Sequence, residues 1–464
     1  ASGGNYNVTV GDEAGTALTT GTHNTFLGST SGDAITDADY NTALGSRALT
    51  TNVLGSANTA VGFDALFTVN PATAVTMYNT AVGYQAGGAV TTGIQNTLIG
   101  GLAGDAITTA NNNTAVGKSS LSATTTGGEN TAVGINALKD NTTASNNTAV
   151  GTNASTANTT GASNTAVGYA ALSVNTSGAS NVAIGALALD ANTTASNNVG
   201  VGLNAAGSTT TGAENVAIGT NALLANTTGA SNVAVGIYAL NANTTAANNV
   251  AVGKNALTAN TTGTLNTALG LAALGANTTA SYNTAIGGYA GDAITTGANN
   301  TALGYGTVSL NTTGADNTGV GYKALNVSTA ANNTAVGSSA LLANTTGADN
   351  VAVGHSTLTA NTTAAGGTAV GYAALTANTT GVENVALGGW ALQANTTGDY
   401  NVALGTNALD ANTTADNNTA VGRNSLGTNT TGANNVALGT SALFANTTAD
   451  NNTAVGYQAG YSNT

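Results

Sequence analysis

The chain repeats one five-residue pattern at intervals of 17 residues. The pattern reads Asn, Thr or Val, usually Ala, then Val, Ile or Leu, and finally Gly, and it occurs 27 times in 464 residues. We number each repeat from its Asn, so that residues 130–146 (NTAVGINALKDNTTASN) occupy positions 1 to 17. Gly fills position 5 in every copy, and Gly367 is the one residue that replaces the Asn of position 1. Such invariance within a single chain predicts stacked, structurally equivalent coils.

The repeat interval changes in only two copies. The copy that begins at Asn58 is four residues longer than the others and holds the only proline, Pro71, whereas the copy that begins at Asn317 is one residue shorter. Loops absorb such changes more easily than regular elements do. We therefore expect one continuous solenoid over residues 1–464, with a loop insertion at residues 71–78.

A parallel β-solenoid is the fold that this repeat predicts. Seventeen residues are too few for a two-helix unit, and Gly and Asn-Thr-Thr would interrupt helices. The alternation at positions 2 to 4 predicts a short strand whose positions 2 and 4 face one side and position 3 the other. We expect Gly to turn the corner, a second strand to run through positions 8 and 9, and Asn-Thr-Thr-Gly to make the return. The fold class is thus all-β with about 27 coils. Disorder is the alternative, but an aliphatic residue at a fixed position of every copy argues against it.

Substitutions and charges within the repeat predict which positions are packed. Six copies have Gly at position 9, and five of them replace the usual Asn of position 12 by an aliphatic residue: Leu18, Ile35, Val90, Ile107 and Ile294. This pairing predicts that positions 9 and 12 share one volume. Charged residues avoid the five-residue pattern and positions 8, 9, 12, 13 and 15. These positions are therefore predicted to be buried or stacked.

Several segments resemble a known family. Residues 248–253 (NNVAVG), 181–185 (NVAIG) and 215–219 (NVAIG) resemble the head-domain repeats of trimeric autotransporter adhesins, and residues 164–172 (NTAVGYAAL) resemble arrays in bacterial and phage fibre proteins. The resemblance covers nearly the whole chain, although the repeat is somewhat longer than in the adhesin heads. It implies a left-handed parallel β-roll, a homotrimer of chains lying side by side, and an extracellular or cell-surface location. The family motif is structural, so it implies no catalytic residues.

The two ends of the sequence suggest a second mode of self-association. The chain starts with Ala1 at position 12 and stops with Thr464 at position 13, so the last coil of one molecule could continue into the first coil of the next. This phase predicts a head-to-tail filament. The alternative is that the ends were set by cutting a longer fibre.

Composition and side-chain pattern give no sign of catalysis. Six Lys and Arg in total and a net charge of −13 argue against nucleic-acid binding, no cysteine is present, and no apolar run is long enough to cross a membrane. His23 and His355 lie in distant coils without a metal-ligand or nucleophile constellation. Asp33, Asp105 and Asp292 recur in Gly-Asp-Ala-Ile-Thr and are interpreted as solvated turn carboxylates. We predict no catalytic, cofactor-binding or metal-binding residues, and no enzyme activity.

The function that the sequence favours is that of an extracellular structural fibre or adhesin-like rod, such as a surface appendage, filament subunit or tail-fibre shaft. One alternative is ice binding through Thr ladders. Another is a glycan-binding fibre, because the aromatic residues other than Phe26 fall at the variable positions 6, 7, 10 and 17, where they could contact a surface glycan or protein ligand or form an interface. Asn-Thr-Thr also reads as an N-glycosylation sequon, although the packing predicted for position 12 argues against its use.

Overall fold

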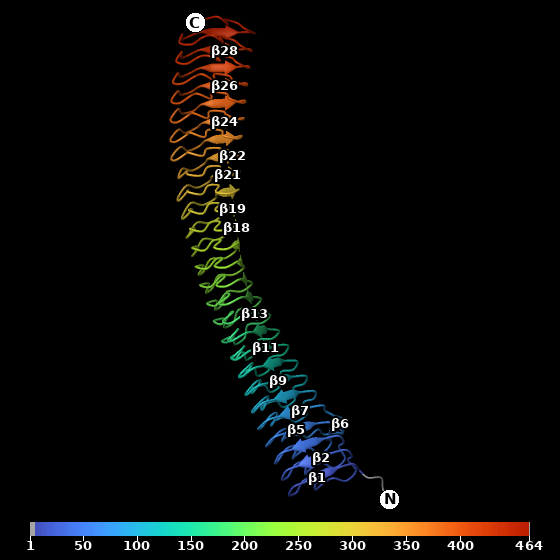
Figure 1. Ribbon diagram of the computed structural model, residues 1–464. Coiled ribbons are helices and arrows are strands. Elements are labelled where there is room, and N and C mark those ends of the chain that lie inside the picture. Colours follow the sequence, from blue (N-terminus) through green and yellow to red (C-terminus); the bar gives the residue numbers. More distant parts are fainter. Residues whose placement is uncertain (1–4, 464) are drawn as a thin grey trace. The chain divides into compact units, whose positions relative to one another are not determined.

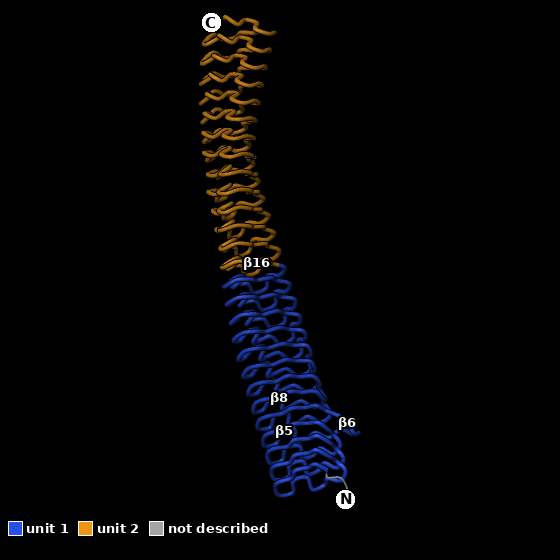
Figure 2. The backbone as a smooth tube through the Cα atoms, turned by 45° about the vertical axis from the view of Figure 1, so that its right-hand side comes forward, with its two compact units in different colours: residues 1–231 blue, residues 232–464 orange. Residues whose placement is uncertain are grey.

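The computed structural model describes residues 5–463, and each copy of the repeat in that range contributes one strand to a parallel ladder. The chain divides into two compact units, residues 1–231 and 232–464, which Figure 2 colours separately. In both units successive strands pair in parallel with equivalent positions opposite each other, as Thr131 pairs with Thr148. The predicted parallel β-solenoid with a 17-residue repeat is confirmed, with about 26 turns. Its handedness stays a prediction.

The ladder strands are three residues long and coincide with positions 2 to 4 (Figure 1). In unit 1 they are β1 (Val8–Val10), β2 (Thr25–Leu27), β3 (Thr42–Leu44), β5 (Thr59–Val61), β7 (Thr80–Val82), β8 (Thr97–Ile99), β9 (Thr114–Val116), β10 (Thr131–Val133), β11 (Thr148–Val150), β12 (Thr165–Val167), β13 (Val182–Ile184), β14 (Val199–Val201) and β15 (Val216–Ile218). In unit 2 they are β16 (Val233–Val235), β17 (Val250–Val252), β18 (Thr267–Leu269), β19 (Thr284–Ile286), β20 (Thr301–Leu303), β21 (Thr318–Val320), β22 (Thr334–Val336), β23 (Val351–Val353), β24 (Thr368–Val370), β25 (Val385–Leu387), β26 (Val402–Leu404), β27 (Thr419–Val421), β28 (Val436–Leu438) and β29 (Thr453–Val455).

The insertion adds the one other strand pair in the described residues. Strand β6 (Val75–Thr76) lies inside the segment predicted as a loop insertion, and it pairs in parallel with β4 (Gly55–Ser56) of the preceding coil. Figures 1 and 2 show β6 at the side of the stack, away from the strand ladder. The extra residues therefore form an additional wall on one flank of unit 1.

The second strand predicted through positions 8 and 9 does not form. Positions 6 to 11 are turns, because left-handed backbone conformations recur there: φ is 57° at Asn136 (position 7) and 50° at Leu138 (position 9). A strand needs consecutive extended residues, and two left-handed residues so close together prevent this. The turns are held by hydrogen bonds between coils instead, such as the amide of Leu138 donating to the carbonyl of Ala154 at 3.1 Å.

The core consists of small aliphatic side chains from positions 3, 8 and 9. In the coil that starts at Asn130, Ala132, Ala137 and Leu138 are fully buried, while the flanking strand residues Thr131 and Val133 are half-exposed. The predicted strand alternation is confirmed, with position 3 inward and positions 2 and 4 outward. Positions 1, 12 and 15 are also buried in most coils, so the uncharged positions are either buried or stacked along the outside, as expected.

The volume shared by positions 9 and 12 is confirmed in three of the Gly-containing coils. A Cβ atom added to Gly104 would lie 2.8 Å from Cδ1 of Ile107, and one added to Gly291 would lie 3.0 Å from Cδ1 of Ile294. In the third coil, a Cβ on Gly87 would lie 3.3 Å from Cγ2 of Val90. An aliphatic side chain at position 12 therefore occupies the space that a position 9 side chain fills elsewhere.

Position 3 shares the same volume, which the sequence analysis missed. The buried ring of Phe26 lies where a Cβ on Gly15 or on Gly32 would be, at 2.9 and 2.8 Å. Leu98 similarly fills the space beside Gly87 and Gly104. The signal was present, because Phe26 and Leu98 are large residues at a position that is usually Ala, and both belong to copies with Gly at position 9. This packing explains why Phe26 is the aromatic residue outside the variable positions.

Candidate functional site

The described residues contain no group of three or more His, Cys, Asp or Glu side chains that could hold a metal ion. His23 is stacked between Tyr6 and Tyr40, with ring centroids 4.9 and 5.0 Å away. His355 stacks on Tyr372 at 5.6 Å. Both histidines therefore belong to rows of aromatic side chains rather than to ligand sets. No helix among residues 5–463 is long and apolar enough to cross a membrane.

The recurrent aspartates are less solvated than the sequence suggested. Burial raises the pKa of Asp33 and Asp105 above its ordinary value, and one carboxylate oxygen of each is buried without a hydrogen-bond partner. Asp292 accepts a hydrogen bond from the hydroxyl of Ser309 in the next coil. These carboxylates lie at position 10, where the turn brings them against the neighbouring coils. They are separate from one another in the stack and form no paired acid and base.

One charged cluster in unit 1 was not anticipated. Nε of Arg47 lies 3.1 Å from Oδ1 of Asp64, and its guanidinium carbon lies 5.5 and 4.5 Å from the ring centres of Phe63 and Phe67. Asp64 is only 7% exposed. A buried carboxylate needs a partner of opposite charge, and Arg47 provides it. A sequence signal existed: Arg47 and Asp64 both occupy position 7, in adjacent coils, and side chains at equal positions of neighbouring coils are stacked. The cluster anchors the surface of the lengthened coil.

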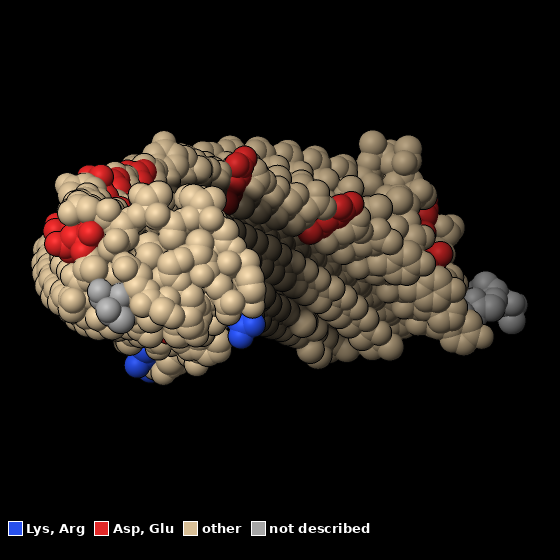
Figure 3. Space-filling view, turned by 90° about the horizontal axis from the view of Figure 1, so that it is seen from above, with Lys and Arg blue, Asp and Glu red and all other residues tan. Residues whose placement is uncertain are grey.

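The other charged side chains in the described residues are exposed or half-exposed. Figure 3 shows the visible acidic side chains in several separate patches and the visible basic ones at the lower left of the view. Most of the surface between them carries neither charge. This partition follows the repeat, because bases occur at positions 6, 7 and 10, whereas many acids occur at positions 16 and 17.

Two ladders of buried Asn side chains run from coil to coil, one at position 1 and one at position 12. At position 1, Nδ2 of Asn113 donates to Oδ1 of Asn96 at 3.2 Å and to the carbonyl of Gly127 at 3.1 Å. Its Oδ1 accepts from the backbone amide of Asn130 at 3.1 Å and from Nδ2 of Asn130 at 3.2 Å. Each amide therefore satisfies groups in both neighbouring coils, which makes the ladder cooperative.

The second ladder lies at position 12. Nδ2 of Asn158 donates to Oδ1 of Asn141 at 3.0 Å and to the carbonyl of Gly161 at 2.9 Å, and both Asn side chains are fully buried. The Asn of the Asn-Thr-Thr sequon is thus inside the folded coil, with its amide nitrogen occupied. This burial argues against N-glycosylation of the folded chain at these residues.

Gly367 interrupts the position 1 ladder, and restoring the side chain is expected to stabilise the fold. Without an amide at residue 367, the amide hydrogen of Asn384 has no Asn Oδ1 to donate to, although Asn350 still accepts from the amide of Gly367 at 2.9 Å. The φ of Gly367 is not in the left-handed region, and an added Cβ would be 3.0 Å from Oδ1 of Asn350. We expect Gly367→Asn to raise the free energy of unfolding by about 1 to 2 kcal/mol.

Chemical denaturation of the two proteins checks this expectation, with hydrogen exchange at Asn384 as a local measure. The matched control is Gly389→Ala, which also adds a side chain to a glycine of unit 2. Its Cβ would meet only the carbonyl oxygen of Tyr372, at 3.9 Å. It should change the stability by no more than about 0.5 kcal/mol. A destabilised Gly367→Asn protein would mean that the ladder gains nothing from this amide.

The outer face of the strand ladder is a continuous surface within each unit. We call it the strand face and define it as positions 2 and 4 of every coil. Position 4 is aliphatic throughout and remains half-exposed or exposed, with Leu27 at 45%, Ile99 at 40% and Leu269 at 45%. Position 2 adds Thr or Val beside it. Charged residues are absent from the strand face of residues 5–463, so within each unit it is an apolar stripe with hydroxyl groups along one margin.

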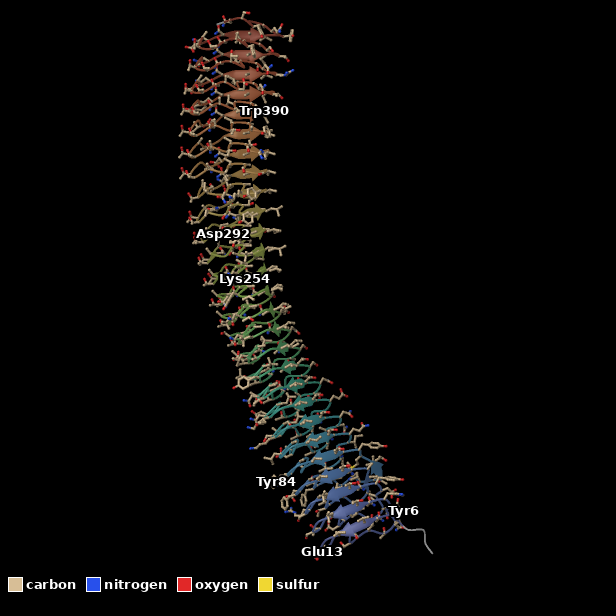
Figure 4. All side chains as sticks on the ribbon, in the orientation of Figure 1. Tyr6, Glu13, Tyr84, Lys254, Asp292 and Trp390 are labelled. Atoms are coloured by element: carbon tan, nitrogen blue, oxygen red, sulfur yellow. The ribbon has the colours of Figure 1, made fainter. Side chains whose placement is uncertain are left out.

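Exposed aromatic side chains form short rows on other flanks. Tyr305 and Tyr322 stack at 5.9 Å, Tyr372 meets Trp390 edge-on at 5.3 Å, and Phe63 stacks on Tyr84 at 5.8 Å. In Figure 4, Tyr84 and Tyr6 lie on opposite flanks of unit 1. The predicted exposure of the aromatic positions is therefore observed, and neighbouring coils bring these rings into contact.

Comparison of the chain with protein-family models, curated proteins and solved structures finds no match. The structure nevertheless defines the class of protein, a β-solenoid repeat protein with Thr/Val strand repeats. Membership of the adhesin-head family stays a prediction from the motif. The head-to-tail filament also stays a prediction, and the residues on which it rests, Ala1 and Thr464, lie outside the described residues.

Proposed function

We propose that the chain is an extracellular structural fibre subunit, adhesin-like in kind, that associates side by side with further copies of itself through the strand face. The observation that carries the proposal is the row of half-exposed and exposed aliphatic side chains at position 4 within each unit. Contiguous apolar surface of this kind is uncommon on monomeric proteins and is typical of interaction sites. The resemblance of residues 248–253 to adhesin-head repeats supports both the surface location and an assembly of three copies.

A second copy of this chain fits the strand face better than an unrelated partner does. The side chains of the strand face repeat once per coil, at the spacing of about 4.8 Å that separates paired strands. A copy of the chain carries the same spacing, so its ridges and hollows match over many coils, whereas another protein would match over a short stretch only. The absence of charge on the strand face also keeps the cost of removing water low.

Ice binding is less well supported by the structure. An ice-binding surface needs free hydroxyl groups in a regular array, but the hydroxyl at position 13 is occupied: Oγ1 of Thr142 donates to the carbonyl of Thr159 at 3.0 Å. On the strand face, position 2 changes between Thr and Val along the chain, and position 4 is aliphatic. The Thr residues at position 14 are exposed, but they form a single row along the coils rather than a two-dimensional array.

The test of self-association is the concentration dependence of mass, measured by sedimentation velocity. The variant Val133→Asp/Val150→Asp/Val167→Asp places three charges on the strand face of adjacent coils. We expect the unmodified chain to form oligomers at micromolar concentration. The dissociation constant of the variant should be at least about tenfold higher, because association would bury its charges without partners. An unmodified chain that is monomeric at about 100 μM would contradict the proposal.

The matched control carries three acids in the same coils at position 6, as Ile135→Asp/Thr152→Asp/Tyr169→Asp. These side chains are exposed, and position 6 holds charged residues elsewhere in the chain. The control should retain the oligomeric mass. If both triple variants dissociate equally, net charge rather than the strand face controls association. Circular dichroism checks that each variant keeps its β-structure. A third variant, Val133→Thr/Val150→Thr/Val167→Thr, removes apolar contact while preserving the branched shape of the side chains.

A further inference from the structure

A row of aromatic side chains at position 17 of unit 1 has a single gap. The rings of Tyr6 and His23 are 4.9 Å apart and nearly parallel, and those of His23 and Tyr40 are 5.0 Å apart. The next two residues at position 17 are Ala57 and Tyr78. All five have φ between 48° and 59°, so their side chains leave the backbone in the same direction. One ring is therefore missing at Ala57, and Tyr40 and Tyr78 are two coil steps apart, about 10 Å.

A hollow occupies the gap. Its volume is about 420 Å³, and the residues that line it are Asp39, Tyr40, Ser56, Ala57, Thr76 and Tyr78. This volume is near the lower end of the range for small-molecule sites. The insertion contributes one wall, because Thr76 belongs to β6 and is held beside Ser56 by the β4–β6 pairing. The insertion therefore changes the lining of this hollow by adding Thr76 to it.

The floor of the hollow offers polar groups that are already oriented. Oδ1 of Asp39 accepts hydrogen bonds from the backbone amide and hydroxyl of Thr22, at 2.6 and 2.9 Å. Among the described residues no donor occupies its Oδ2. The hydroxyl oxygen of Ser56 accepts from the amide of Asp39 at 3.0 Å, so its hydrogen is free to donate to a ligand. Thr76 adds an exposed hydroxyl.

We propose that this hollow binds one pyranose ring of a neutral glycan between Tyr40 and Tyr78. A ring placed midway would lie about 5 Å from each tyrosine, a stacking distance equal to those already present in the row. A pyranose presents C–H groups on its faces and hydroxyl groups around its edge. The faces pack on the two tyrosines, and two adjacent hydroxyls meet the carboxylate of Asp39 and the hydroxyl of Ser56. No residue of the strand face is involved, so the proposal is independent of self-association.

The chemistry of the floor favours this ligand class over two others. A planar aromatic hydrocarbon would fill the space between the rings but would exclude water from Oδ2 of Asp39 without offering it a donor, which is unfavourable. An acidic sugar would bring a second carboxylate to Asp39 on a chain whose net charge is already −13. A neutral sugar supplies donors to Asp39 and acceptors to Ser56 and Thr76. Affinity for one ring is expected in the millimolar range, and multiple copies in a fibre would strengthen it.

The test is saturation-transfer NMR on the full chain with methyl β-D-glucopyranoside, methyl β-D-galactopyranoside and N-acetylglucosamine, alongside phenol and sialyllactose. The decisive variant is Ala57→Tyr, which fills the gap with the residue found on either side. Because Tyr40 and Tyr78 adopt the same backbone conformation as Ala57, this variant should fold normally. We expect it to reduce binding of the neutral sugars at least tenfold, and Tyr40→Ala and Tyr78→Ala to do the same.

Tyr282→Ala is the matched control, since Tyr282 is an exposed tyrosine at position 17 of unit 2 and lies next to Leu265 and Asn299 in the order of coils. It should leave binding unchanged. The proposal is overturned if Ala57→Tyr binds the sugars as the unmodified chain does, or if no neutral pyranoside shows saturable binding up to about 20 mM. Preferential binding of phenol or sialyllactose would overturn the assignment of the ligand class.

Discussion

Replacing Gly134 with Ala is expected to destabilise the solenoid by at least about 3 kcal/mol, although it adds only one methyl group. Gly134 is the position 5 glycine of its coil and has φ of 137°, a conformation that residues with a side chain rarely adopt. An added Cβ would lie 2.5 Å from the carbonyl oxygen of Gly151 and 2.6 Å from its carbonyl carbon. That carbonyl belongs to the next coil, so relief of the clash requires the two coils to move apart.

The measurement is chemical and thermal denaturation, with hydrogen exchange of β10 and β11 as the local observable. Exchange should accelerate in these two strands first, because repeat proteins lose structure where a coil interface is weakened. Gly101→Ala is the matched control: Gly101 lies at position 6, outside the left-handed region, and an added Cβ would meet no atom within 4 Å. It should shift stability by at most about 0.5 kcal/mol. Equal stability of the two variants would show that position 5 tolerates a side chain.

The turn at position 5 could be predicted because its glycine is invariant. The left-handed conformation of position 9 could not be predicted. Leu138 is buried with φ of 50°, in a region that costs a residue with a side chain about 1 to 2 kcal/mol. Local propensity therefore argues against the observed backbone. Burial of the leucine side chain offsets the cost by about 1.5 to 3 kcal/mol. Only the glycines found at position 9 of six copies hinted that this position is left-handed, and they were interpreted through packing alone.

The candidate binding hollow, too, could be predicted only in part from the sequence. Counting repeats places Tyr40, Ala57 and Tyr78 at the same position, so the interrupted aromatic row can be derived from the sequence. The wall of the hollow cannot, because Val75 and Thr76 pair with Gly55 and Ser56 only once the coils are stacked. Non-local pairing of two short segments depends on the surrounding fold, not on the propensity of either segment.

The largest pH-dependent effect is expected for Asn113→Asp. Asn113 is fully buried and both donates and accepts in the position 1 ladder, whereas an ionised aspartate can only accept. Its carboxylate would face the carbonyl of Gly127 and Oδ1 of Asn96, two acceptors that now receive a hydrogen bond. An uncompensated buried charge of this kind costs about 3 to 5 kcal/mol at neutral pH.

The pH profile follows from the sign of the pKa change. Burial raises the pKa of the new carboxyl in the folded state above its value of about 3.9 in the unfolded chain, so the folded state binds more protons. The stability lost by the variant is therefore smallest below about pH 4, where a neutral carboxyl can donate one hydrogen bond, and it grows as pH rises toward the folded-state pKa.

Urea denaturation between pH 3 and 8 measures the profile, with Asn146→Asp as the control. Asn146 is exposed at position 17, where Asp316 and Asp349 occur naturally in other coils. The control should follow the unmodified chain at every pH, because its carboxylate stays in water. If Asn113→Asp shows no greater loss at pH 8 than at pH 3, the buried amides do not need their donor groups, and the Asn at position 1 would have to be explained by shape alone. A pH-dependent loss confined to Asn113→Asp would show that the donor groups of the position 1 amide ladder stabilise the stack of coils.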